Sequence, residues 1–251
     1  VRLASMDPDA PAVEMLLARP PALPPPDLAP WRAGNALPGV WHFDSGRPGP
    51  HAVVLALTHG NEIAGAVLLE RWLRQGLRPL HGRLSLGFAN LDAFSRYDAA
   101  DPTAARFVEE DLNRLWDPAV LDGPRRSVEL RRARALRPLL DDADLLLDLH
   151  SMFWPGDPLI LSGGAEGALD LAMQAGEPPL VLADPGHAGA TRLIDYPPLA
   201  RRGAALLLEA GWHWEEATVA RMERVARRVL ALAGVIPAPV PPPAVPPVLA
   251  R

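Results

Sequence analysis

Polar side chains that could do chemistry occur in three short segments of the 251-residue chain, each at the end of an apolar run. Residues 58–62 (THGNE) follow the apolar run 52–57, and residues 148–151 (DLHS) close the run that starts at 144. Glu209 follows a third run, at 204–208. In open α/β sheets, active sites gather where strands end and loops lead into helices. We therefore expect these three positions to share one site.

Two histidines and one glutamate from these segments have the composition of a catalytic zinc site. His59 and Glu62 lie three residues apart at a predicted strand-to-helix junction, and Gly60 lets the backbone turn tightly between them. His150 adds a ligand from a second strand end, which gives three protein ligands and leaves the fourth position for water. Taken alone, a His-x-x-Glu pair is weak evidence. The pattern at three strand ends favours one Zn²⁺ per chain.

Two residues of this group have structural interpretations as well. For His150 the alternative is a buried histidine that is hydrogen-bonded to a backbone carbonyl. For Asp148 we expect a side chain directed away from His150 and a supporting role rather than direct ligation.

A second group of polar residues occupies the segment 106–114 (RFVEEDLNR). A guanidinium beside an amide, as at Arg114 and Asn113, is well suited to bind a carboxylate through two parallel hydrogen bonds. The alternative is a solvated loop with a local Asp–Arg pair. From the residues alone, this structural alternative is favoured.

The composition excludes several other classes of protein. Basic residues number 25 and acidic residues 30, so the net charge of −5 argues against a general nucleic-acid binder. The absence of cysteine excludes disulfide scaffolds and thiolate metal sites. No apolar run approaches the roughly 20 residues of a membrane span, and we see no secretion signal. We therefore expect a cytoplasmic protein that contacts neither membranes nor nucleic acid.

Apolar runs alternate with amphipathic stretches over residues 31–236. This alternation predicts an α/β fold, a three-layer α/β/α sandwich with a mixed sheet. The predicted strands are 39–44, 52–57, 84–89, 144–149, 158–161, 180–182 and 204–208. The predicted helices are 62–75, 126–140, 165–175 and 215–233. The flanking segments 1–30 and 237–251 are rich in proline, so we interpret them as an N-terminal arm and a C-terminal tail.

Four sequence segments together resemble one enzyme family. The segments LTHGNEIAG, EEDLNRLWDP, LLLDLHS and LLLEAG occur in this order. They are similar to the succinylglutamate desuccinylase/aspartoacylase family, within the carboxypeptidase A-like zinc hydrolase superfamily, over roughly residues 35–236. The resemblance implies a zinc-carboxypeptidase-like fold and hydrolysis of the amide bond of a small N-acylated, acidic amino acid.

The resemblance also implies roles for individual residues, beginning with zinc ligands in HGNE and DLHS. Asn113 and Arg114 of DLNR would hold a carboxylate of the substrate. Arg106, five residues before the aspartate of DLNR, matches the arginine that polarises the scissile carbonyl. Glu209 of LLLEAG would be the general base. Arg192, in HAGATRLIDYP, resembles a further carboxylate-binding arginine.

The chain departs from the family pattern in two places. Family members usually continue into a β-rich domain, whereas here a proline-rich segment follows the last predicted helix. The segment GWHWEEA after Glu209 also differs from the family pattern. Alternative functions are a zinc carboxypeptidase acting on peptides, a non-catalytic zinc or metabolite-binding protein, and a scaffold that acts through its proline-rich arms. The sequence leaves a homo-oligomer open as well.

Overall fold

One mixed sheet runs through the molecule in the computed structural model. The structure describes residues 22–101, 103–163, 166–184, 186, 189–202, 205–238 and 248–250. The strands follow the order β1-β3-β2-β4-β7-β5-β6-β8. They are β1 (Val40–Asp44), β2 (His51–Ala56), β3 (Arg83–Phe88), β4 (Leu145–Met152), β5 (Leu159–Leu161), β6 (Leu180–Leu182), β7 (Ala205–Trp212) and β8 (Val248–Ala250). The β1/β3 and β5/β7 pairs are antiparallel, and the other neighbours are parallel.

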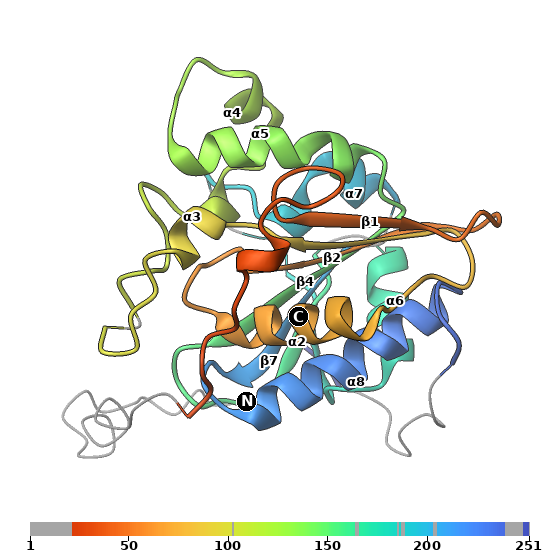
Figure 1. The fold of residues 1–251 in the computed structure, drawn as a ribbon. Helices are drawn as coiled ribbons and strands as arrows, with labels where there is room; N and C mark the ends of the chain where they lie inside the picture. Colours follow the sequence, from red (N-terminus) through yellow and green to blue (C-terminus); the bar gives the residue numbers. More distant parts are fainter. Residues whose placement is uncertain are drawn as a thin grey trace.

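Helices cover both faces of this sheet (Figure 1). Helices α2, α6 and α8 pack together on one face, and α5 packs with α4 and α7 on the other. The helices are α2 (Ile63–Gln75), α3 (Leu91–Phe94), α4 (Pro118–Asp122), α5 (Val128–Asp141), α6 (Glu166–Ala175), α7 (Pro197–Arg202) and α8 (Glu216–Leu232). Short 3-10 turns are η1 (Ala29–Trp31), η2 (Leu112–Arg114) and η3 (Leu193–Asp195). The predicted three-layer α/β/α sandwich with a mixed sheet is confirmed.

The central strands form because their side chains are apolar on both sheet faces, as the sequence pattern predicts. Every residue of β2 is buried, and so is every residue of β4 except Met152. Parallel neighbours need a crossover connection, and α2 supplies the one between β2 and β3. Gly76 ends α2 in the left-handed conformation, with φ of 71°, and Ser127 caps the N-terminus of α5.

Two strands extend beyond their predicted ends, and both extensions bear on the candidate site. β4 continues to Met152 and β7 to Trp212, so His150 and Glu209 lie within strands rather than after them. The two residues are direct partners in the β4/β7 register, which shifts between His150 and Met152. The polar groups thus interrupt the apolar strands themselves.

The proline-rich segments are only partly described. Residues 1–21 of the predicted arm, and residues 239–247 and 251 of the predicted tail, lie outside the described part of the chain. Leu23 and Leu28 are buried in the core, so the packed body begins before the expected boundary at Trp31. Val248–Ala250 pairs with β6 as an edge strand, which is a position that proline-rich sequence tolerates.

None of the helices in the described residues has the length and apolar character needed to cross a lipid bilayer.

Candidate metal centre and substrate pocket

The three predicted polar segments meet in one cavity of about 600 Å³. It lies at the carboxyl ends of β2, β4 and β7, the edge where the parallel strands of this sheet end. All eight residues predicted for the site line it: His59, Glu62, Arg106, Asn113, Arg114, His150, Arg192 and Glu209. Residues separated by up to 150 positions in the chain are therefore brought together as the sequence pattern predicts.

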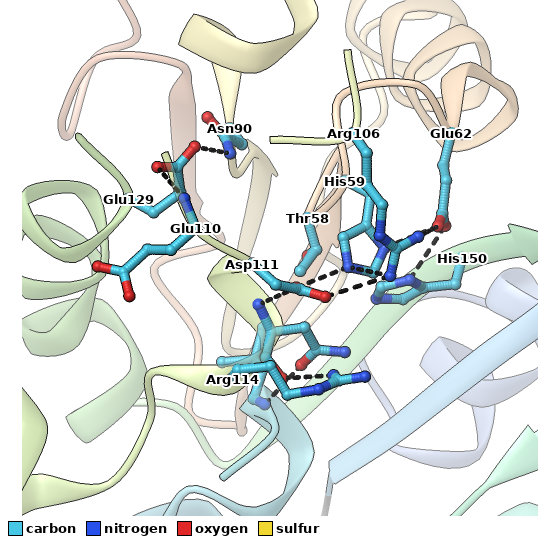
Figure 2. A network of polar contacts seen from close by, with 12 residues as sticks. Thr58, His59, Glu62, Asn90, Arg106, Glu110, Asp111, Arg114, Glu129 and His150 are labelled. Atoms are coloured by element: carbon cyan, nitrogen blue, oxygen red, sulfur yellow. Dashed lines mark hydrogen bonds and ion pairs between the residues drawn. The ribbon is translucent and has the colours of Figure 1, made fainter. Parts of the chain in front are cut away.

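His59, Glu62 and His150 form a buried cluster whose ligand atoms face one another (Figure 2). The Glu62 carboxylate lies between the two imidazoles, with Oε1 2.7 Å from Nδ1 of His59 and Oε2 3.0 Å from Nδ1 of His150. One candidate ligand atom from each residue lies within 4.8 Å of the others. Burial alone would raise the pKa of Glu62, but the imidazoles of His150 and His59 hold it well below its usual range. This carboxylate is therefore ionised, as a metal ligand must be.

Each imidazole is oriented by a carboxylate on its other nitrogen. Nε2 of His59 lies 2.8 Å from Asp111, and Nε2 of His150 lies 2.7 Å from Asp148. Thr58 donates a hydrogen bond of 2.8 Å to the second oxygen of Asp148. Such carboxylate–histidine pairs fix the ring orientation at metal sites. The supporting role expected for Asp148 fits these contacts.

The orientation expected for Asp148 is wrong. We predicted that its side chain would point away from His150, but residues two apart on a strand face the same side of the sheet. Both side chains therefore point to the cavity face, where they contact each other.

The backbone around the first two ligands is tightly packed. Leu57, directly after β2, has φ of 59°, a conformation that is strained for a branched side chain. A Cβ at Gly60 would lie 2.5 Å from the backbone oxygen of Ala105 and 2.5 Å from the backbone nitrogen of Phe94. Glycine is needed here because neighbouring backbone fills the space, rather than for a turn with positive φ.

Glu209 reaches the cavity from β7, and one of its two carboxylate oxygens has no partner among the described residues. Its Oε2 atom is buried and accepts no hydrogen bond from the described residues. Burial raises the pKa of Glu209 to about 8, and the negative charge of Glu62 adds to the shift. A carboxyl group with a pKa near neutrality can both accept and release a proton at physiological pH. The structure thus gives Glu209 the environment of an acid–base group.

The segment 106–114 lies beside the metal cluster (Figure 2). Nη2 of Arg106 lies 3.2 Å from Asp111, and Nη1 lies 3.6 Å from Glu62. The side-chain oxygen of Asn113 accepts a hydrogen bond of 2.8 Å from the backbone N–H of Leu193, which leaves its NH₂ group as a donor toward the cavity. Arg114 donates to the carbonyl of Asn113. This geometry favours the binding interpretation of the segment over that of a solvated loop.

Glu129 holds this segment in place, and no feature of the sequence pointed to it. Its fully buried carboxylate accepts hydrogen bonds from the backbone N–H groups of Val108, Glu109 and Glu110, at 2.7, 3.1 and 3.3 Å. The side chain of Asn90 donates a fourth, at 3.1 Å (Figure 2). Glu129 thus connects helix α5 to the loop that carries the arginines and Asn113.

His213 is a second residue of the cavity that sequence reasoning did not select. Its Nδ1 lies 2.7 Å from the hydroxyl of Ser151, and its ring packs against Phe153 and Trp214. Burial lowers the pKa of His213 to about 4, so the ring is neutral at pH 7. It lies in the segment GWHWEEA, which the sequence marks as unusual for the family.

Comparison with known proteins bears on this arrangement. Residues 48–153 match the model of the succinylglutamate desuccinylase/aspartoacylase catalytic domain. This range contains His59, Glu62 and His150 as well as the segment 106–114, while Glu209 and Arg192 lie beyond it. The match covers less than half of the chain, and over residues 48–153 the chain is similar to the succinylglutamate desuccinylase/aspartoacylase family. The resemblance on which the sequence analysis relied is thereby confirmed.

Individual relatives of this family match parts of the chain. It is 33% identical to the aspartoacylase of Mus musculus over 103 residues and 27% identical to that of Xenopus tropicalis over 113 residues. These matches cover 38% and 41% of this chain, but only 31% and 34% of the relatives. The matched part therefore spans about a third of the length of either aspartoacylase.

Solved structures of the family share the fold over a longer stretch. A succinylglutamate desuccinylase from a Silicibacter species superposes with a TM-score of 0.65 at 21% identity, covering 84% of this chain and 64% of that one. At this level of identity, the likeness supports the family fold and carries no information about the substrate.

Proposed function

We propose that the chain is a zinc-dependent deacylase that hydrolyses the amide bond of a small N-acylated amino acid. The observation that carries this proposal is the buried His59–Glu62–His150 cluster, with the unpartnered Glu209 oxygen in the same cavity. The donor set fits zinc because two imidazole nitrogens and one carboxylate oxygen are the ligands of His₂Glu catalytic sites. The named family relatives, which are aspartoacylases and succinylglutamate desuccinylases, support the reaction class.

His59, Glu62 and His150 would hold one zinc ion per chain. When bound, zinc supplies a Lewis acid that polarises a carbonyl and brings the pKa of a water from 15.7 toward about 7. Asp111 and Asp148 support this site, because each accepts the proton on the outer nitrogen of one ligand imidazole.

Glu209 would act as the general base. It takes the proton of the attacking water and later delivers it to the leaving amine. Two features support this role: its outer oxygen has no partner among the described residues, and burial brings its pKa close to neutrality. General acid–base catalysis of this kind typically contributes 10²–10⁴-fold to the rate.

Arg106 would stabilise the negative charge that develops on the carbonyl oxygen during attack. Its guanidinium lies at the edge of the metal cluster and its side chain is 41% exposed toward the cavity, so it can reach a bound substrate. One such donor is typically worth about 3 kcal/mol of transition-state stabilisation.

Asn113 and Arg114 would bind the α-carboxylate of the substrate and so orient the amide bond. The free NH₂ group of Asn113 and the guanidinium of Arg114 both line the cavity. The expectation of a second acidic group on the substrate depends on Arg192, which also lines the cavity but forms ion pairs with Asp195 and Asp184.

A carboxypeptidase acting on peptides would use the same metal ligands, and Asn113 and Arg114 would bind the terminal carboxylate of the peptide. The family match and the named relatives favour acylated single amino acids. A non-catalytic metal-binding protein would have no use for the unpartnered carboxylate of Glu209.

The test is to measure the bound metal and then assay the zinc-loaded protein on N-acetyl, N-formyl and N-succinyl amino acids and on short peptides. We expect one equivalent of zinc and hydrolysis of acylated amino acids. Cleavage of peptides alone would instead support a carboxypeptidase. A zinc-loaded protein that cleaves none of these compounds would contradict the proposal.

A further inference from the structure

Arg192 lines the cavity, but two carboxylates of the chain already bind its guanidinium. Nε lies 2.6 Å from Asp195, and Nη2 lies 3.2 Å from the same carboxylate and 2.7 Å from Asp184. Only 4% of the Arg192 side chain is exposed. A carboxylate of a ligand would meet two negative charges beside one positive charge, and would have to displace one of them at the cost of leaving it unpaired.

These ion pairs are built into the surrounding backbone. A Cβ at Gly163 would lie 2.9 Å from one oxygen of Asp195, and a Cβ at Gly186 would lie 2.7 Å from the other. The two glycines therefore let the backbone approach the carboxylate closely from both sides. The carboxylate of Asp195 is therefore packed between two backbone segments in the position where it pairs with Arg192.

Arg114 is in a different situation. Its guanidinium donates to the carbonyl of Asn113 at 2.8 Å, and within the described residues no carboxylate lies at ion-pair distance from it. Arg106 contacts Asp111 and Glu62 at the metal cluster. Among the described residues that line the cavity, Arg114 is thus the one cationic side chain whose charge is left for a carboxylate of the substrate away from the reacting carbonyl.

The rest of the cavity offers apolar surface. Met152, Phe153 and Trp154 line it at the end of β4, and Leu161 and Leu207 line it from β5 and β7. Surface of this kind binds uncharged groups, because removing apolar area from water is favourable. It disfavours a charged group, which would lose its hydration without gaining a partner.

We infer from these contacts that the substrate carries a single carboxylate and that its remaining substituents are uncharged and apolar. The ion pairs of Arg192 select against the second acidic group that the sequence alone favoured. This inference rests on the proposed deacylase function and narrows its substrate class to monocarboxylic N-acyl amino acids.

The first experiment compares N-acetyl-leucine and N-acetyl-methionine with N-acetyl-aspartate and N-succinyl-glutamate on the zinc-loaded full chain. We expect kcat/KM to be at least tenfold higher for the neutral pair. Equal or higher values for the acidic pair would overturn the inference. Hydrolysis of none of the four would contradict the proposed function, and the selectivity is then judged from binding.

Binding is measured by calorimetry on the Glu209→Gln variant, in which we expect turnover to be slowed about 10²–10⁴-fold. We expect Kd to be at least tenfold lower for N-acetyl-leucine than for N-acetyl-aspartate. Tighter binding of N-acetyl-aspartate would overturn the inference whether or not the wild type is active.

A second experiment tests the cause of the selectivity. Asp184→Asn removes one charge from Arg192, and because the Asp184 side chain is 31% exposed the variant should fold. We expect the ratio of kcat/KM for the acidic substrates to kcat/KM for the neutral substrates to rise at least fivefold. Asp195→Asn should raise this ratio as well. Asp44→Asn, at the exposed end of β1, is the control and should leave the ratio unchanged. An unchanged ratio in both Arg192-partner variants would overturn the role of these ion pairs.

Discussion

At the scale of single residues, each imidazole of the metal cluster has a carboxylate at both of its nitrogens. The imidazole of His59 has Glu62 on one nitrogen and Asp111 on the other, and that of His150 has Glu62 and Asp148. Neither ring can rotate without losing a charge-assisted hydrogen bond. The Nδ1 atoms of His59 and His150 therefore already face the Glu62 carboxylate, and this arrangement is pre-organised to bind a cation.

Replacement of a ligand histidine should remove the metal. We expect His59→Ala and His150→Ala to lower bound zinc from one equivalent per chain to a small fraction, as measured by elemental analysis after dialysis. His81→Ala is the matched control, because His81 is an exposed histidine of the loop before β3. A full equivalent of zinc in either ligand variant would show that the ligand assignment is wrong.

Glu209 is expected to be the base and not a ligand. Glu209→Gln keeps the shape of the side chain but cannot accept a proton, so zinc content should stay at one equivalent while kcat falls about 10²–10⁴-fold. Glu216→Gln, at the start of α8, is the control. A loss of less than tenfold, or a loss of zinc together with activity, would count against this role.

At the scale of elements, strands β1 to β7 and the long helices could be predicted because their burial repeats in sequence, whereas β8 lies in the predicted tail. The positions of Val219, Met222, Val225 and Val229 mark one face of α8, and all four are buried. The short turns η2, η3 and α3 were missed, because three or four residues are too few to show a period. Their conformation depends on contacts with distant segments instead.

The candidate site could be predicted where polar residues interrupt apolar strands, as at His150 and Glu209. Glu129 could not, because a glutamate in the first turn of an amphipathic helix is the ordinary choice at a solvated N-terminus. Its partners lie 19 to 39 positions away in the chain. The ion pairs of Arg192 were missed for the same reason: nothing in the sequence indicates that Asp184 and Asp195 face the same guanidinium.

Glu129 gives a prediction about how one helix positions a loop. Burial raises the pKa of Glu129, but hydrogen bonds from Val108, Asn90 and the next two N–H groups outweigh this effect and lower it below 4.5. The Glu129→Gln variant replaces one acceptor oxygen by a donor that faces backbone N–H groups. We expect a loss of about 2 kcal/mol in the free energy of unfolding at pH 7, and a raised KM because Asn113 and Arg114 are less well placed.

The pH dependence of this loss separates it from a mere packing defect. A depressed pKa contributes stability above the unfolded value of 4.5, and this contribution disappears as the pH falls through the folded value. The difference between wild type and Glu129→Gln should therefore shrink below about pH 4 in denaturant titrations. Glu216→Gln, 64% exposed at the start of α8, should cost less than about 0.5 kcal/mol at any pH. A constant difference for Glu129→Gln would contradict the electrostatic account.

At the scale of the whole molecule, one cavity at the carboxyl ends of the central strands contains both the metal cluster and Asn113 and Arg114, the proposed carboxylate-binding pair. β2, β4 and β7 are parallel neighbours, so their carboxyl ends deliver His59, His150 and Glu209 to the same edge. Arg114 comes from outside the sheet, on a loop that bridges to Thr191 near η3. In the proposed function, the sheet thus positions the residues assigned to the reaction, while the loop that packs on it positions the residue assigned to substrate binding.

We therefore expect replacement of Arg114 to weaken substrate binding without changing zinc binding. Because a guanidinium and an amide donor match the two oxygens of a carboxylate, Arg114→Ala should raise KM for an N-acyl amino acid at least tenfold. Zinc content should not change, since Arg114 contacts none of the three ligands. Arg114→Lys should restore binding only in part, because an ammonium cannot make the two-pronged contact. Arg131→Ala, 73% exposed on α5, is the matched control.

The decisive comparison uses the wild-type enzyme on an N-acyl amino acid and on its carboxamide. The carboxamide keeps the scissile bond and the side chain but has no negative charge for Arg114. Its kcat/KM should therefore be lower by at least tenfold in the wild type. In Arg114→Ala the two compounds should be hydrolysed at similar rates, because the charge no longer has a partner. Equal kcat/KM for both compounds in the wild type would mean that no carboxylate clamp operates, and would leave a zinc amidase that recognises its substrate by other contacts.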